Sequence, residues 1–281
     1  MRRLRIIAAT LATVTILGAA LAAPAAAVTD GALDDNDHPY VGLLLAQDSN
    51  GQPLWRCSGT LISSELFLTA GHCTFGAAHV ELFFAAGPIP TASGYPATGA
   101  DRCAGITGYP CTGDIGGTPW THPQYDDNAF FRYDLGVVVL DEPYPMAEYG
   151  ALPALNVLDQ LAKRRGLKDL GFTSVGYGLQ MSFPDAASWK EHNTRTRMVA
   201  HPRLIQINTP GFTGDFSILL SNNANTGGTC FGDSGGANFI GTSNVLAGVT
   251  SFGLNSTCAG TGGVYRVDRA DDLDWLRTFT D

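Results

Sequence analysis

The chain consists of short apolar stretches separated by turn-rich stretches, and few segments have the length or spacing of a helix. Apolar and β-branched residues gather in runs that end at Gly, Pro or Asn, which is typical of strands in sandwiches and barrels. We therefore expect an all-β protein. The predicted strands are Tyr40–Leu45, Gly59–Ile62, Leu66–Ala70, Val80–Phe84, Leu135–Leu140, Thr173–Tyr177, Arg203–Ile207, Ala237–Phe239 and Val245–Ser251.

Four further segments depart from this strand pattern. Leu155–Leu167 has apolar residues at helical spacing and predicts a short surface helix, and Ala270–Phe279 predicts a closing helix packed on the body. Thr91–Pro119 is rich in Gly, Thr and Pro and predicts a long surface excursion. Asp141–Ala154 contains three prolines and reads as a connector between two halves.

The first residues have the features of a secretory signal. Arginines at positions 2, 3 and 5 precede an apolar run that ends near Ala23, and Ala25-Ala26-Ala27 forms a small-residue cleavage site. A membrane anchor is the alternative, but the run is Ala-rich and ends in a cleavage pattern. We expect residues 1–27 to be a signal peptide and the mature chain to be secreted, extracellular and free of the membrane.

Charge and cysteine content narrow the class further. The net charge is −9, and losing the three arginines of the signal changes it to −12. Such an acidic chain repels nucleic acid, which we exclude as a partner. Six cysteines behind a signal predict three disulfides, and no Cys-x-x-Cys spacing supports a zinc site.

A glycine-rich motif around one serine is the first candidate for chemistry. In Gly232-Asp233-Ser234-Gly235-Gly236, the glycines allow a turn that exposes the serine hydroxyl to a substrate. The motif also fits the serine turn of α/β-hydrolases, whose acid and histidine follow the serine in the chain. The last histidine here is His201, so that fold is excluded. The base for Ser234 must therefore lie upstream.

One histidine and one aspartate have suitable surroundings. Of the six histidines, only His72 follows a predicted strand and precedes a cysteine that can fix its turn. Asp134 directly precedes the apolar run Leu135–Leu140, so its carboxylate would lie at the edge of a buried strand. A base, a carboxylate that orients it and a nucleophilic hydroxyl are the groups of a catalytic triad. We expect His72, Asp134 and Ser234 to form one.

Three motifs together resemble the signature blocks of the chymotrypsin/trypsin-like serine peptidases. They are Thr69-Ala70-Gly71-His72-Cys73, Asp134-Leu135 before a valine-rich strand, and Gly232-Asp233-Ser234-Gly235-Gly236, in the family's order of His, Asp and Ser. The resemblance runs from Val28 through the closing helix, apart from Thr91–Pro119. It implies a chymotrypsin-like fold of two antiparallel six-stranded-type β-barrels with a C-terminal helix.

The same resemblance implies domain limits and residue roles. Residues 28–150 would form a barrel carrying the His and Asp, and residues 151–281 a second barrel carrying the Ser, with helix 270–279. Ser234 would attack the scissile carbonyl, His72 would transfer the proton and Asp134 would orient His72. The N–H groups of Gly232 and Ser234 would form the oxyanion hole. The protein would be a monomeric serine endopeptidase acting on polypeptides through an acyl-enzyme, without a cofactor.

The cysteine pairing and the activation step also come from the resemblance. It implies Cys57–Cys73 and Cys230–Cys258, and leaves Cys103–Cys111 without a family equivalent. Family members become active when a new apolar N-terminus inserts and its α-amine pairs with the Asp before the nucleophile. Here that pair would be Val28 and Asp233. Because Val28 follows the predicted cleavage site, we expect signal cleavage itself to create the activating terminus.

Substrate preference is expected to follow from an uncharged pocket. Gly228 stands six residues before Ser234, where trypsin-like members carry Asp. An open, uncharged pocket favours cleavage after Phe, Tyr, Leu or Met over Lys or Arg. The residues that the resemblance assigns to substrate binding are Gly228, Thr229, Phe231, Ser251, Phe252, Gly253 and Gly263.

The sequence also leaves room for two rival functions, and it contains one acidic cluster that could suggest a metal site. One rival is a catalytically impaired homologue that acts as a binding protein. It is suggested by two departures from the family pattern, Thr29-Asp30 at the N-terminus of the mature chain and Ala237 after the glycine pair. An esterase on the same scaffold is the other rival. The acidic residues Asp34, Asp35 and Asp37 read as a solvated loop, so no metal is expected.

Overall fold

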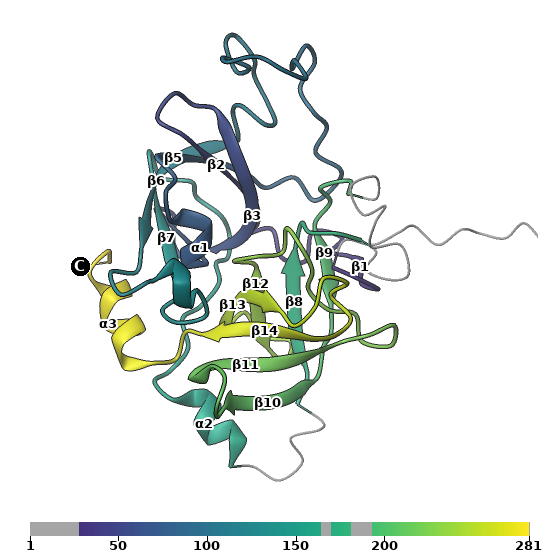
Figure 1. The fold of residues 1–281 in the computed structure, drawn as a ribbon, viewed down its shortest axis with the longest axis vertical. Coiled ribbons are helices and arrows are strands. Elements are labelled where there is room, and N and C mark those ends of the chain that lie inside the picture. Colours follow the sequence, from purple (N-terminus) through teal and green to yellow (C-terminus); the bar gives the residue numbers. More distant parts are fainter. Residues whose placement is uncertain (1–27, 164–169, 181–192, 281) are drawn as a thin grey trace, which may run out of the picture.

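The computed structural model describes residues 28–163, 170–180 and 193–280. Its strands form two antiparallel groups, one closed barrel and one larger sheet that curls into a half-barrel (Figure 1). The predicted all-β, two-part fold is confirmed, although the hydrogen bonds of the second sheet do not close into a ring. The predicted signal peptide, and the end of the helix expected at Leu155–Leu167, lie outside the described residues.

Two strands of the first barrel, β2 and β4, bury both of their faces. All seven residues of β2 and all four of β4 are buried, which explains their continuous apolar sequence. Around the barrel the order is β2-β3-β4-β7-β6-β5. The strands are β2 (Val41–Gln47), β3 (Pro53–Leu61), β4 (Leu66–Thr69), β5 (His79–Phe83), β6 (Ile115–Thr121) and β7 (Gly136–Leu140).

The second sheet has eight strands in the order β1-β9-β8-β12-β13-β14-β11-β10. Its first strand comes from the N-terminal end of the described chain, so the sheet takes one element from the other half of the sequence. The strands are β1 (Ala32–Leu33), β8 (Phe172–Gly176), β9 (Met198–Ala200), β10 (Leu204–Thr209), β11 (Gly214–Asn222), β12 (Ala237–Ile240), β13 (Leu246–Gly253) and β14 (Gly260–Arg266). The domain limits at 28–150 and 151–281 stay a prediction.

The helices are short. They are α1 (Gly71–Thr74), a 3₁₀ turn at Asp127–Ala129, α2 (Val157–Ala162) and the predicted closing helix α3 (Ala270–Arg277). Helix α3 belongs to the C-terminal half, yet it packs beside the first barrel, where Phe279 meets Trp120 with ring centroids 6.0 Å apart (Figure 1). Within the described residues, no helix is both long and apolar enough to cross a membrane.

One prediction about a surface excursion is wrong in part. The excursion expected at Thr91–Pro119 ends early, because Ile115–Thr121 forms strand β6 inside the barrel. This strand pairs with β5 on one side and β7 on the other. Its sequence contains two glycines and a proline, residues that are uncommon in strands, so the sequence pattern did not predict it. The segment is a strand because it pairs with its two neighbours.

A buried charge cluster joins the N-terminal segment to both sheets. Asp34, only 1% exposed, accepts hydrogen bonds from Nε of Arg197 at 2.8 Å and from Nδ1 of His38 at 2.5 Å. Arg197 is also fully buried and donates to the carbonyls of Val41 and Phe84, both at 3.0 Å. The interpretation of Asp34 as part of a solvated loop is therefore wrong, because it is the counter-charge of a buried arginine.

We expect Asp34→Asn to lower the free energy of unfolding by about 3–5 kcal/mol, since it leaves Arg197 buried without its counter-charge. Urea unfolding at neutral pH, on protein that also carries Ser234→Ala to prevent self-digestion, measures this change. Asp37→Asn, at an exposed neighbouring position, is the matched control and should change the free energy by less than about 0.5 kcal/mol. Equal stability of the two variants would contradict this role for Asp34.

The same variant should alter the pH dependence of stability. Burial raises the pKa of Asp34, but the hydrogen bonds from His38 and Arg197 outweigh burial and hold the pKa below its usual value. A carboxyl group with a lowered pKa stabilises the fold above its unfolded pKa of about 3.9, and this contribution disappears as the pH falls through the folded value. Asp34→Asn should therefore remove part of the acid-induced loss of stability.

Candidate active site

His72 and Asp134 form a close pair at the edge of the first barrel. His72 lies on α1, and its Nδ1 is 3.0 Å from Oδ2 and 3.1 Å from Oδ1 of Asp134. The backbone N–H of His72 also donates to Oδ1 of Asp134 at 2.9 Å. Because a carboxylate only accepts, Nδ1 carries the proton, and Nε2 of the neutral ring is left as a proton acceptor.

Asp134 is fully buried and reaches the second sheet as well as the first. Its Oδ2 accepts a hydrogen bond from the hydroxyl of Ser251, on β13, at 2.5 Å. The preceding Tyr133 adopts a left-handed conformation with φ of 51°, and the N–H of Leu135 donates to the carbonyl of Tyr133 at 2.7 Å. This tight turn directs the carboxylate inward just before β7 begins.

The loop that carries Ser234 is fastened to strand β3. The N–H of Ser58 donates to the carbonyl of Ser234 at 2.7 Å, and the Ser58 hydroxyl donates to the carbonyl of Gly232 at 2.9 Å. Gly235 has a φ of 76°, and a Cβ there would lie 2.0 Å from Oγ1 of Thr69 and 2.8 Å from N of Ala70. The glycine therefore lets the serine loop approach the segment that leads into His72.

Several polar groups around Ser234 are unpaired. Among the described residues, the backbone N–H groups of Gly232 and Ser234 have no acceptor, whereas those of Asp233 and Gly235 donate to carbonyls. The Ser234 hydroxyl and Nε2 of His72 likewise make no hydrogen bond within this part of the chain. Two free N–H groups beside a free hydroxyl can hold a developing oxyanion. A hydrogen bond between base and nucleophile often forms only when substrate is bound.

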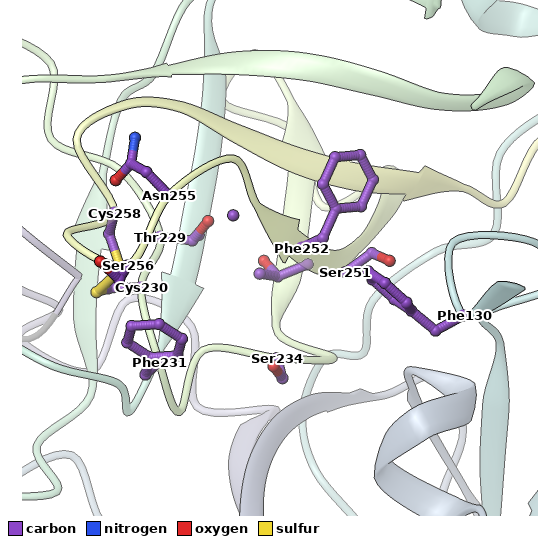
Figure 2. A pocket seen from close by; sticks show the side chains of 12 residues that line it. Phe130, Thr229, Cys230, Phe231, Ser234, Ser251, Phe252, Asn255, Ser256 and Cys258 are labelled. Carbon is purple, nitrogen blue, oxygen red and sulfur yellow. A yellow bond between two sulfur atoms is a disulfide. The ribbon is translucent and has the colours of Figure 1, made fainter. Parts of the chain in front are cut away.

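A cavity of about 330 Å³ opens next to Ser234. Figure 2 shows Phe231 and the Cys230–Cys258 disulfide on one side of this pocket, Phe130 and Phe252 on the other, and Ser234 between them. No charged side chain lies among its described lining residues. These are Phe130, Thr229, Cys230, Phe231, Ser234, Thr250, Ser251, Phe252, Gly253, Asn255, Ser256 and Cys258.

Two residues assigned to the pocket from the sequence lie outside its lining. Gly228 pairs with Thr29, and a Cβ at this glycine would lie 2.4 Å from Cγ of Asn222, so Asn222 fills the space that a side chain would need. A Cβ at Gly263 would lie 2.3 Å from the Phe252 ring, so this glycine makes room for that ring. Neither glycine lies in the lining of this cavity, and their assignment to substrate binding stays a prediction.

The pocket also contains residues that sequence reasoning missed. Phe130 enters it from the loop before Asp134, and Thr250, Asn255 and Ser256 join the predicted set. Phe130 is 40% exposed, and its ring centroid is 6.3 Å from that of Phe252. The sequence feature that could have indicated Phe130 is its position four residues before the candidate catalytic Asp134.

Asp233 is a buried carboxyl that forms no salt bridge among the described residues, although the charge of Arg56 opposes the effect of burial on its pKa. It is fully buried and accepts hydrogen bonds from the N–H groups of Gly178 at 2.7 Å and Cys230 at 2.9 Å. Burial raises its pKa to about 7. In the described part of the chain, no salt bridge reaches it. Val28 is also fully buried, in contact with Met198 and Ala200, and Thr29 pairs with Gly228 in the segment leading to the serine.

Six cysteines form three disulfides: Cys57–Cys73 and Cys230–Cys258, which the resemblance implies, and Cys103–Cys111, the pair that it leaves over. Predicted disulfide bonding is thus confirmed. The potential metal ligands that gather most closely in the described residues are Cys57, His72 and Cys73. Both sulfur atoms belong to one disulfide and cannot act as thiolate ligands, so this group does not fit a metal ion.

Fold and site together define a trypsin-like serine protease. The family model named Trypsin matches residues 32–275, so the chain belongs to the Trypsin family. It is 27% identical over 231 residues to a trypsin of Saccharopolyspora erythraea, covering 82% of this chain and 87% of that protein. It is also 27% identical over 254 residues to a chymotrypsin of Phaedon cochleariae, covering 86% and 78%.

A solved structure supports the fold assignment. HL collagenase matches with a TM-score of 0.60 and 20% identity, covering 86% of this chain and 94% of that structure. At this level of identity, the likeness concerns the fold. The predicted family and the chymotrypsin-like fold are confirmed.

We expect the pKa of His72 to depend on Asp134. Burial lowers this pKa, but the charge of Asp134 and the hydrogen bond with it outweigh burial, and Asp127 adds a smaller effect, so the pKa lies above its usual value. Asp134→Asn should therefore lower the pKa of His72, which NMR titration in a Ser234→Ala background measures. Asp127→Asn is the matched control and should lower it less. An unchanged pKa in Asp134→Asn would show that the two side chains do not interact in solution.

Proposed function

We propose that this protein is a secreted serine endopeptidase that cleaves polypeptides through an acyl-enzyme intermediate. The observation that carries the proposal is an unpaired hydroxyl and two unpaired N–H groups on the serine loop, which packs against the segment leading into His72, a histidine oriented by a buried aspartate. Membership of the Trypsin family supports the same chemistry. The six paired cysteines and the predicted signal support secretion.

In this proposal, each step of the reaction is carried out by a named residue of the site. As the Ser234 oxygen bonds to the scissile carbonyl carbon, its proton passes to Nε2 of His72, and the carbonyl oxygen gains the electron pair of the double bond. The N–H groups of Gly232 and Ser234 stabilise that oxyanion. When the oxyanion collapses, the C–N bond breaks and His72 gives its proton to the leaving amine. Water repeats these steps on the acyl-enzyme and releases Ser234.

Asp134 contributes in two ways. It fixes the tautomer and orientation of His72, and its charge stabilises the imidazolium that forms while the ring holds the proton. The hydrogen bond from Ser251 occupies one oxygen of the carboxylate, so the aspartate cannot rotate freely away from the ring. The roles of His72, Asp134 and Ser234 remain part of this proposal.

The pocket favours an apolar side chain before the scissile bond. Its described lining holds three phenylalanine rings and a disulfide and no carboxylate, so a lysine or arginine would be desolvated there without a counter-charge. Burying a side chain such as Phe or Leu is worth about 1.5–3 kcal/mol. We infer a preference for Phe, Tyr, Leu and Met over Lys and Arg.

Digestion of a peptide library tests activity and preference together. We expect cleavage after Phe, Tyr, Leu or Met to exceed cleavage after Arg or Lys by roughly tenfold or more, from the burial energy of the apolar side chain. The Ser234→Ala variant, digested in parallel, should cleave none of the peptides.

Other results would identify the rival functions. Faster cleavage after Arg than after Phe or Leu would contradict the assigned preference while leaving the protease in place. Ester hydrolysis without digestion of casein would identify an esterase. Binding of polypeptides by both proteins without cleavage by either would identify a catalytically impaired binding protein.

Activation is proposed to require a free α-amine at Val28. Asp233 is fully buried, and a buried carboxylate needs a positive partner. Val28 is buried as well, and its neighbour Thr29 donates a hydrogen bond to the carbonyl of Gly228 at 3.1 Å. A chain that starts at Val28 would thus place a charged amine beside the segment that carries Asp233. Cleavage of the signal after Ala27 would supply it.

We expect the mature protein to start at Val28, which N-terminal sequencing of the secreted protein determines. A variant with one extra glycine before Val28 should lose at least about tenfold in kcat/KM, because the amine no longer reaches the buried carboxylate. An extra residue inserted after the exposed Asn50, in the turn before β3, is a control of equal length and should leave activity unchanged. A different mature start, or full activity of the extended variant, would overturn this activation step.

A further inference from the structure

Arg56 lies on the same strand that holds the nucleophile loop. It precedes Ser58 by two residues on β3, and alternate residues of a strand face the same side. The Ser58 side chain faces the serine loop, since its hydroxyl donates to the carbonyl of Gly232. In agreement, Nε and Nη2 of Arg56 both lie 3.4 Å from the position that a Cβ of Gly232 would occupy. A guanidinium thus rests against a proposed oxyanion-hole residue.

This guanidinium is partly exposed and forms no salt bridge in the described part of the chain, although its charge acts on the buried carboxyl of Asp233 and lowers the pKa of that group. Among the described residues, Arg56 takes part in no salt bridge, and its side chain makes no hydrogen bond, in contrast to Arg197, Arg266 and Arg269. A second cation is close by, since burial lowers the pKa of Arg195 and the charge of Arg56 lowers it further. Both guanidinium groups are partly exposed, whereas Asp233 is fully buried, so the surface beside the serine loop is locally positive in a chain of net charge −9.

The position of Arg56 relative to the pocket shows which part of a substrate it would meet. The described pocket lining comes from residue 130 and from residues 229–258, and includes no residue of β3. If the substrate residue before the scissile bond places its side chain in this pocket, the substrate residues after the bond lie on the opposite side of Ser234. His72 must protonate the leaving amine there, and the Cys57–Cys73 disulfide joins the segment of His72 to the residue after Arg56.

We propose that Arg56 is a specificity-determining residue that binds an acidic side chain one or two residues after the scissile bond. Its planar guanidinium can form paired hydrogen bonds with a carboxylate. The site is partly exposed, so the interaction resembles a surface ion pair and its effect should be moderate and sensitive to salt. The inference rests on the proposed protease function and names its substrate class more closely.

Matched peptides test this inference. Each pair has Phe before the scissile bond and carries either Glu or Gln at the first or the second position after it. On the wild-type protein we expect kcat/KM for the Glu peptide to exceed that for the Gln peptide by about two- to fivefold at one of these positions. The ratio should fall towards one in about 0.5 M salt, where the screening length is only a few ångströms.

Variants of Arg56 decide whether this residue is the cause. Arg56→Gln should abolish the preference for Glu, and Arg56→Glu should reverse it so that a Lys peptide is cleaved faster than the Gln peptide. Because the peptides of a pair are compared on the same variant, any general change in activity cancels in the ratio. Arg132→Gln is the matched control. It removes the same charge from an exposed arginine that lies over the Phe131 and Phe216 rings, and should keep the preference.

Equal rates for Glu and Gln peptides on the wild-type protein would overturn the inference, as would a preference that persists in Arg56→Gln. In both cases the peptides are still cleaved, so the protease assignment stands. Failure to cleave any peptide of the set, with the Ser234→Ala variant behaving identically, would instead overturn the proposed function itself.

Discussion

The carboxylate of Asp134 is the group on which the active-site geometry depends. It has no contact with water, and it accepts hydrogen bonds from His72 on the first barrel and from Ser251 on the second sheet. Removing a carboxylate from water is costly, and these hydrogen bonds offset that cost only when both partners are in place. The site therefore forms only when the two sheets pack together, which makes catalytic competence a property of the assembled fold rather than of either half.

The chemistry of the site could be predicted from the sequence because its residues occupy local motifs. His72 and Ser234 stand in short segments whose glycines and cysteines constrain the backbone, and Asp134 precedes a strand with a clear apolar pattern. The chain order of these groups excluded the main competing hydrolase fold. Longer-range features were less accessible. Strand β6 holds two glycines and a proline, and only its partners β5 and β7 make it a strand.

Side-chain environments account for the other errors. Asp34 looks like one of several loop acids, and nothing local indicates that Arg197, far along the chain, is buried against it. Gly228 and Gly263 stay predictions for substrate binding, and the resemblance that assigns them does not show that Asn222 and the Phe252 ring occupy the adjoining space. Arg56 carries no motif at all. Its proposed role follows from its position on β3. Arg56 faces the same side of the strand as Ser58, and Ser58 is hydrogen-bonded to the serine loop.

The central claim is that His72 acts as the base for Ser234, and the rate of covalent labelling by a fluorophosphonate as a function of pH tests it most directly. This account predicts a single adduct on Ser234, with a labelling rate that rises with pH along the same curve as the deprotonation of His72 followed by NMR. Replacement of His72 by alanine should remove that rise. An adduct on another residue, or a Ser234 labelling rate that does not change as His72 is deprotonated, would contradict the account.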